Sequence, residues 1–259
     1  MDPLPLVVCG AAVVLYALGR RGKVRVWREV SFYSGVALAF VVLERPFDYW
    51  ADTWLSVHMS QHIVLMTVVP PLVVLGRPWP RMWLPFPLSA RRAVGGTLAR
   101  SPSFRRHAGF LMLPWVALAV QSGMVALWHV PQLYDAAAHN EWIHVLEHVC
   151  FFVPALVFWG GLLDAPPVRA RIDHLHRATW FAAAMIPSWI LAIMFAFASA
   201  PVYTAYPSMT DQQLAAGVMW VPGSLTYFVA AFAAFYRWLE PTAAEPQTVE
   251  PRPEELSWT

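Results

Sequence analysis

The chain alternates long apolar segments with short polar ones, and seven of the apolar segments are long enough to cross a membrane. They lie at about residues 3–19, 28–46, 55–75, 108–129, 142–163, 178–200 and 213–238. A transmembrane helix needs about 20 mostly apolar residues, and about 17 is the lower limit. The pattern therefore predicts an all-α membrane protein, a bundle of seven transmembrane helices, in which the ends of the first two spans are the least sharply marked.

The composition strengthens this interpretation. Hydrophobic residues make up 58% of the chain and charged residues only 13%, and the mean hydropathy is +0.47. A soluble domain carries about twice that share of charge. Cys9 and Cys150 both lie in apolar segments, which gives no disulfide framework. Because no basic residue precedes Cys9, we interpret the first segment as an uncleaved span and not as a signal peptide.

The distribution of lysine and arginine predicts the orientation, because membrane loops rich in these residues stay in the cytoplasm. Of the 18 such residues, 17 fall between spans one and two, three and four, or five and six, or after span seven; only Arg45 falls on the other side. We therefore expect the N-terminus outside and the C-terminus in the cytoplasm. The loop at 77–107 is rich in Pro, Trp and Arg, and it is expected to lie along the cytoplasmic lipid interface.

The same patterns divide the chain into a transmembrane domain, residues 1–239, and a cytoplasmic tail, residues 240–259. The tail is acidic and rich in proline, and a segment of this composition cannot bury an apolar core, so we expect it to be disordered. Membrane lipid is a sufficient partner for the basic residues, and no nucleic acid is needed to explain them.

With this topology, six of the nine histidines face the outer side. His58 and His62 occupy the first two turns of the third span, and His144 and His148 the first two turns of the fifth. His129 closes the fourth span, and His139 follows in a short loop as the weakest candidate. Polar groups in a membrane span are costly and usually functional. Paired histidines at matched depth therefore indicate a site.

The spacing predicts a metal site. Residues four apart share one face of a helix, so each histidine pair can point at one centre. Met59, His62 and Met66 lie along a single stripe, and imidazole with thioether suits copper, Cu(I) especially. We expect four primary ligands, His58, His62, His144 and His148, followed by His129 and Met59. Carboxylates that could orient these ligands are Glu147 and Asp135, with Glu44 and Asp48 as further candidates.

Other interpretations of the same residues stay open. The histidines could form a structural polar network. His144-x-x-Glu147-His148 formally matches the inverted zinc-protease motif, in which two histidines hold zinc and the glutamate activates water, but five-residue motifs are weak evidence. Two of the histidines could instead ligate haem. A transporter is a weaker interpretation, because no acidic or histidine relay continues inward.

The ordered motifs resemble a known family. They are His58-Met-Ser-Gln61-His62 running into Pro70-Pro71 and Gly76-Arg-Pro78, then Trp128-His129-Val-Pro131 with Tyr134-Asp135, then His144-x-x-Glu147-His148 and Phe158-Trp159. Together, over residues 40 to 240, they resemble the CtaG family of bacterial cytochrome c oxidase assembly factors, of the Bacillus type.

This resemblance implies a multi-pass protein of the bacterial plasma (inner) membrane that helps a haem-copper oxidase mature by handling copper. The implied partners are oxidase subunits and a periplasmic or extracellular copper donor. The expected function is that of a non-enzymatic metallochaperone, which takes Cu(I) at the outer face and passes it on. The resemblance leaves the ligand set open, so copper is inferred from the residues and from the family together.

Overall fold

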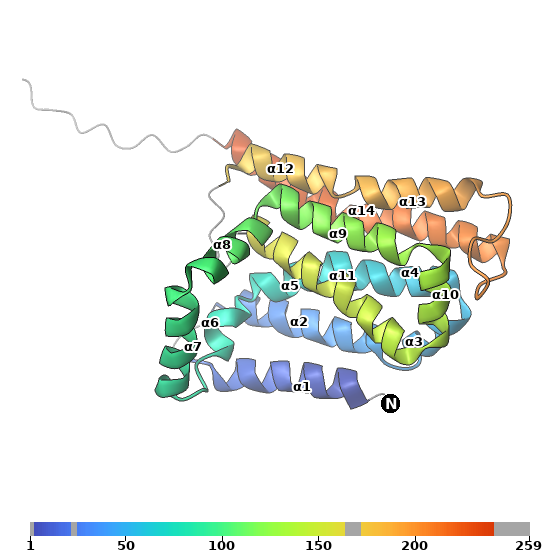
Figure 1. Cartoon of the computed structure of the whole chain (residues 1–259). Helices are drawn as coiled ribbons and strands as arrows, with labels where there is room; N and C mark the ends of the chain where they lie inside the picture. The colour runs from blue at the N-terminus through green and yellow to red at the C-terminus, as the bar shows by residue number, and fades with distance from the viewer. Residues whose placement is uncertain (1–2, 22–24, 164–171, 241–259) are drawn as a thin grey trace, which may run out of the picture.

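The structure is a computed structural model, and it describes residues 3–21, 25–163 and 172–240. Within these ranges the regular structure is entirely helical, and no strand is present. The long helices run side by side along one common direction, with α1 at one edge of the bundle and α12, α13 and α14 at the other (Figure 1). An all-helical architecture is therefore confirmed for the described part of the chain.

Among the described residues, five stretches are long and apolar enough to cross a membrane. They are α2 (Val26–Leu43), the run Leu55–Leu75, α11 (Glu141–Leu162), the run His174–Phe197 and α14 (Met209–Leu239). A sixth is possible if α8 (Pro102–Leu111) and α9 (Pro114–Trp128) form one span, although the two are bent by 70°. The apolar helix α1 (Pro3–Leu18) has only 16 residues. Multiple candidate spans indicate a multi-pass membrane protein, whereas seven spans and their orientation stay predictions.

The third predicted span is a broken helix. It consists of α4 (Leu55–Ile63), a π-helical turn η1 (Val64–Val68) and α5 (Val69–Leu75). Pro70 has no N–H to offer the carbonyl of Met66, which would be its partner in a regular α-helix. The indole Nε1 of Trp159 on α11 donates to that carbonyl instead, at 3.1 Å. The π-helical turn thus begins two residues after His62, between the histidines and the rest of the span.

The sixth predicted span is also interrupted, into α12 (His174–Ala183) and α13 (Ile186–Phe197). Both pieces pack along α14. The core beneath them is aromatic: the rings of Trp159 and Tyr227 stack with centroids 5.2 Å apart, and Phe158 and Phe181 pack around this pair. This core holds α11, α12 and α14 together and gives the histidine-bearing helix a rigid support.

Short helices close the end of the bundle at which the histidines lie. They are α3 (Phe47–Thr53) and α10 (Pro131–His139). The loop of residues 198–208, which connects α13 to α14, lies at the same end (Figure 1). The carboxylate of Asp135 on α10 accepts hydrogen bonds from the backbone N–H groups of Thr204 and Ala205, and from the Thr204 hydroxyl. Asp135 therefore holds this loop in place over the histidine end.

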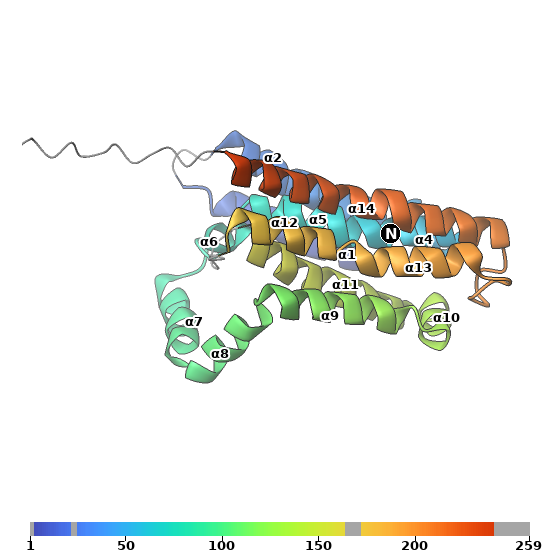
Figure 2. The same cartoon turned by 90° about the horizontal axis from the view of Figure 1, so that it is seen from above.

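At the opposite end, α6 (Pro78–Met82) packs on α1, and α7 (Leu88–Arg100) and α8 extend away from the bundle (Figures 1 and 2). The Arg81 guanidinium lies 3.8 Å from the centre of the Tyr16 ring, and its Nη2 is 2.9 Å from the Glu29 carboxylate. Helices α7 and α8 have no buried residues. The predicted interfacial loop thus folds as three helices, and the predicted tail lies outside the described residues from 241 onward.

Candidate metal centre

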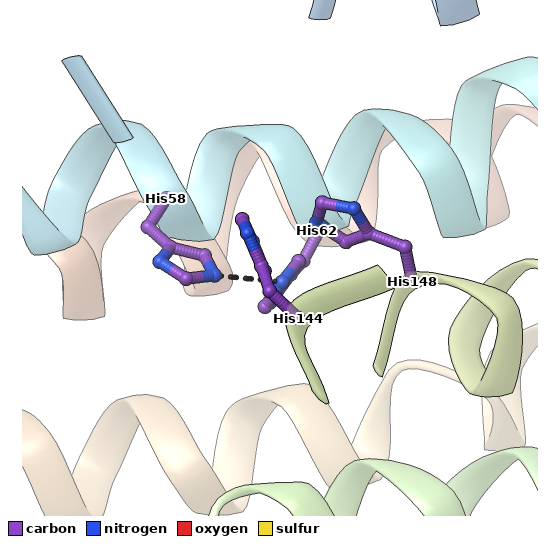
Figure 3. Close-up of side chains that lie close together, drawn as sticks. All are labelled: His58, His62, His144 and His148. Atoms are coloured by element: carbon purple, nitrogen blue, oxygen red, sulfur yellow. Dashed lines mark hydrogen bonds between the residues drawn. The ribbon is translucent and has the colours of Figure 1, made fainter. Parts of the chain in front are cut away.

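Four imidazoles converge from two helices at one end of the bundle. His58 and His62 come from α4, and His144 and His148 from α11 (Figure 3). One ring nitrogen of each histidine can be chosen so that all four lie within 4.8 Å of one another. The ring centroids are 4.4 Å apart for His58 and His62, 4.2 Å for His144 and His148, and 4.9 Å for His58 and His144. This four-histidine cluster could hold a metal ion.

The positions at which α4 and α11 begin place the two histidine pairs at matching depth. Asp211 of α14 caps the first turn of α4: its carboxylate accepts from the N–H groups of Leu55 at 2.6 Å and Ser56 at 3.2 Å. On α11, the Asn140 side chain accepts from the N–H groups of Trp142 and Ile143. Side-chain acceptors at these positions satisfy N–H groups that have no partner within the helix. Each helix therefore starts just before its histidine pair.

A tyrosine from the loop of residues 198–208, the covering loop, fixes the tautomer of His58. The Tyr206 hydroxyl donates to the Ala51 carbonyl at 2.9 Å and lies 2.8 Å from Nδ1 of His58. Burial raises the pKa of Tyr206 above its usual range, so the hydroxyl keeps its single proton. Since that proton goes to the carbonyl, Nδ1 of His58 must donate its own N–H to the hydroxyl oxygen. Nε2 of His58 then presents a lone pair to the centre of the cluster.

The second histidine of α4 faces the same point. Nε2 of His62 lies 3.0 Å from Nε2 of His58, a separation at which one proton is shared between the two nitrogens (Figure 3). The Nε2 atoms of His144 and His148 are buried and have no hydrogen-bond partner within the described ranges. A metal ion competes with protons for such nitrogens, because only the deprotonated nitrogen can ligate. The donor set is therefore suited to a cation.

A buried carboxylate faces the cluster. Glu147 is 0% exposed, and its two oxygens lie 3.9 Å from Nε2 of His58 and 3.9 Å from Nε2 of His62. Neither oxygen has a hydrogen-bond partner in the part of the chain that the structure describes. A buried charge without a partner is strongly unfavourable, and a cation beside it relieves that cost. Glu147 therefore fits a metal held by the four imidazoles.

Two predicted ligands lie elsewhere. His129 ends α9, and its Nδ1 donates to the Val125 carbonyl at 2.7 Å, while its ring packs against Tyr134 and Phe151. Met59 points into an apolar cluster with Leu55 and Tyr134. The convergent ring nitrogens come from His58, His62, His144 and His148, so His129 and Met59 lie outside the four-histidine cluster.

The carboxylates predicted to orient the ligands also differ in where they lie. Asp135 binds the covering loop, and Asp48 accepts a hydrogen bond at 3.1 Å from Gln61, whose amide also donates to the Val42 carbonyl. Glu44 is buried. His139 is exposed, and its Nδ1 donates to the Asp135 carbonyl. Of the four carboxylates predicted to orient the ligands, Glu147 is the one that lies 3.9 Å from the His58 and His62 rings.

The sequence analysis did not identify three residues that build this site: Tyr206, Asp211 and Gln61. Tyr206 and Asp211 lie more than a hundred residues from the histidines they support. Gln61 sits between the paired histidines in the motif and is fully buried, so it carried a local signal. A polar residue at every position from Ser60 to His62 in an apolar span indicates that several faces of the helix are packed.

Comparison with known proteins assigns most of the chain to one family. A family model described as the cytochrome c oxidase caa3 assembly factor, Caa3_CtaG, matches residues 12–241. The chain belongs to the Caa3_CtaG family. This confirms the family inferred from the motifs, and the match covers all four histidines of the cluster.

Curated relatives of this Caa3_CtaG chain include uncharacterised proteins of three mycobacteria. One from Mycobacterium bovis is 22% identical over 253 residues, which cover 90% of this chain and 37% of the relative. One from Mycobacterium leprae is 23% identical over 257 residues, which cover 88% of this chain and 38% of the relative. The chain thus spans less than two fifths of the length of these relatives. No solved structure matches it.

Proposed function

We propose that this chain is a non-enzymatic membrane assembly factor that binds copper, as Cu(I), through His58, His62, His144 and His148 and delivers it to a haem-copper oxidase of the caa3 type. The observation that carries the proposal is the convergence of the four imidazoles beside the unpartnered Glu147 carboxylate. The family supplies the biological setting, oxidase assembly. The copper is cargo in this proposal, and the protein's residues bind and release it.

The chemistry of the donors favours copper over the hard cations. Imidazole suits copper and zinc, whereas magnesium and calcium take oxygen ligands. With the single Glu147 carboxylate beside it, a monovalent Cu(I) gives a site with no net charge, which suits burial in a bundle. His144 is only partly buried, so the cluster has one side closer to the surface through which metal can enter and leave.

The proposed setting is the bacterial plasma membrane, with the four-histidine cluster near the outer face. There a periplasmic or extracellular donor would supply the metal, and oxidase subunits would receive it. Removal of a ligand should then reduce oxidase maturation most when copper is scarce.

A zinc-dependent hydrolase is the alternative function, because Glu147 lies beside the imidazoles, where it could activate a metal-bound water. Such an enzyme needs a metal-bound water within reach of the glutamate and an open ligand position. Four convergent imidazoles would fill the usual four zinc positions and leave none for water. The cluster therefore fits metal binding without hydrolysis better than a hydrolase.

Maturation of the oxidase in cells tests the proposal. A strain that lacks this gene would be complemented with the wild-type chain, with His58→Ala, with His148→Ala, or with His139→Ala as a control from the same end of the bundle. Copper content and activity of the membrane-purified caa3 oxidase would be measured at limiting copper. We expect both cluster variants to yield copper-deficient oxidase and the control to match wild type. Full maturation with both cluster variants would refute the proposal.

A further inference from the structure

A cavity of about 50 Å³ lies beside the four-histidine cluster, between α4, η1, α9, α13 and α14. A cavity of this size is large enough for a water molecule or a small ion. His62 is the only residue of the cluster among those that line it. The cavity is therefore a neighbouring site that shares one wall with the cluster.

Three thioethers line this cavity: Met59 from α4, Met66 from η1 and Met219 from α14. Met59 and Met219 are 1% and 2% exposed. The π-helical turn places Met66 on the same wall as Met59 and His62, in line with the stripe that the sequence predicts. Methionine fills irregular gaps in many cores, so the thioethers alone do not define a site.

Buried polar atoms without hydrogen-bond partners also line this cavity, and they are evidence for a ligand that is independent of the thioethers. His62, only 3% exposed, has an Nδ1 with no hydrogen-bond partner in the described chain, and the Oε1 of Gln121 is equally alone at 5% exposure. Nε2 of His129 is a third such atom. Because Nδ1 of His129 donates to the Val125 carbonyl, its Nε2 carries a lone pair. Buried acceptors without partners are costly, so these atoms indicate a ligand.

The geometry points to a second metal site in this cavity, which would bind Cu(I) through the Met59, Met66 and Met219 thioethers and Nε2 of His129. Thioether and imidazole are soft donors that select Cu(I). The lining contains no carboxylate or thiolate, so it offers a divalent cation little charge compensation. The two predicted ligands that lie outside the four-histidine cluster, Met59 and His129, both belong to this site.

His62 connects the two sites. Its Nε2 faces His58 in the cluster, while Nδ1, on the other side of the same ring, is left for the cavity. We infer that copper moves between a nitrogen-only site and a sulfur-rich site through this one imidazole. The inference takes the identity of the metal from the proposed function, but the four donors of the second site lie outside the four-histidine cluster, and His62 only borders both sites.

X-ray absorption of the detergent-purified full chain, loaded anaerobically with Cu(I), tests this inference. We expect two copper equivalents and a sulfur shell in the wild type. The double variant Met59→Leu/Met219→Leu should lose one equivalent together with the sulfur shell and keep a nitrogen-only equivalent. Met194→Leu, a methionine that is 59% exposed, is the matched control and should keep both.

The reciprocal variant separates this inference from the proposed function. His144→Ala/His148→Ala should lose the nitrogen-only equivalent and keep the sulfur-bound one. If instead the wild type has a nitrogen-only equivalent and no sulfur shell, the four-histidine site stands and the second site is refuted, which leaves water as the occupant of the cavity. Loss of the sulfur shell in the histidine variant would also refute an independent second site.

Selenomethionine provides a test without any substitution in the packed core. Protein in which selenium replaces the methionine sulfur keeps the shape of the cavity. Selenium-edge absorption after Cu(I) loading should reveal a copper atom at bonding distance from selenium. Its absence at full copper loading would overturn the proposal even if the leucine variants failed to fold.

Discussion

The Tyr206 hydroxyl lies 2.8 Å from Nδ1 of His58, and this contact joins the loop between α13 and α14 to the four-histidine cluster. The same hydroxyl donates its proton to the Ala51 carbonyl, so the orientation of the imidazole and its tautomer are set together. Ligand histidines in metal sites commonly donate their second N–H to such a partner, which holds the ring in place. Tyr206 is thus a positioning residue of the proposed site.

Removal of this hydroxyl should weaken metal binding. We expect Tyr206→Phe to lower Cu(I) affinity by about 10- to 100-fold, the usual effect of losing a partner of a ligand histidine. Competition with a Cu(I) chelator of known affinity measures this change. Tyr203→Phe removes a hydroxyl from the same loop that bonds to the His129 carbonyl, and it should leave the affinity of the cluster unchanged. Equal affinities for both variants would contradict the role of Tyr206.

Asp211, which caps α4, should contribute both to the stability of the fold and to metal binding. Asp211→Ala removes the carboxylate acceptor of the Leu55 and Ser56 N–H groups, and we expect a loss of about 1–2 kcal/mol in the free energy of unfolding. Because α4 carries His58 and His62, metal affinity should fall as well. Denaturation in detergent and chelator competition measure the two effects.

A matched control for this cap is available at the other end of the bundle. Asp173 caps α12 through the N–H of His176, and α12 begins at the end of the bundle opposite α3 and α10 (Figure 1). We expect Asp173→Ala to cost stability without any change in metal affinity. If Asp211→Ala lost stability but bound copper like wild type, the start of α4 would not position the ligands.

The sequence predicts the four central histidines because a spacing of four residues in a helix is a local rule. His58 with His62 and His144 with His148 needed only that rule and the matched depth of their spans. The contacts of Tyr206 and Asp211 could not be predicted in this way, since they join segments that are far apart along the chain. Their positions depend on how the loop of residues 198–208 folds back, and no periodic pattern describes a loop.

Local backbone geometry explains the other differences. Pro70 breaks the third span into α4, η1 and α5, which the periodicity of an unbroken helix does not predict. The fourth span extends less far than predicted, because α8 and α9 meet at a bend of 70° just before Pro114. Met59 lies in α4 before this break, three positions before His62, so helix periodicity alone could not tell whether its side chain lines the cluster or the neighbouring cavity.

The close contact between α1 and α6 should be sensitive to one added methyl group. A Cβ at Gly19 would lie 1.9 Å from the Arg81 carbonyl oxygen, which forces the backbone to move. We expect Gly19→Ala to destabilise the protein by about 1–3 kcal/mol, as overpacking usually does. The control is Gly10→Ala, where a Cβ meets nothing within 4 Å, and which should be neutral or slightly stabilising. Thermal unfolding in detergent compares the two; equal midpoints would contradict this packing.

Replacement of the buried Glu147 carboxylate should distinguish a role in copper binding from a role in hydrolysis. Glu147→Gln keeps the size of the side chain but removes its charge, so we expect weaker Cu(I) binding with the four imidazoles still in place. Oxidase maturation should then recover when copper is supplied in excess. A hydrolase that used Glu147 to activate water would fail at any copper concentration. Glu141→Gln, on the exposed start of the same helix, is the control.

The central claim is that His58, His62, His144 and His148 together bind copper, and elemental analysis of the purified chain tests it most directly. Wild type, His58→Ala, His148→Ala and the control His139→Ala would be loaded with Cu(I), washed with a weak chelator and analysed for copper and zinc. We predict that wild type and the control retain copper, and that each cluster variant loses one equivalent relative to them. Wild-type copper content in both cluster variants, or zinc in place of copper in the wild type, would contradict the claim.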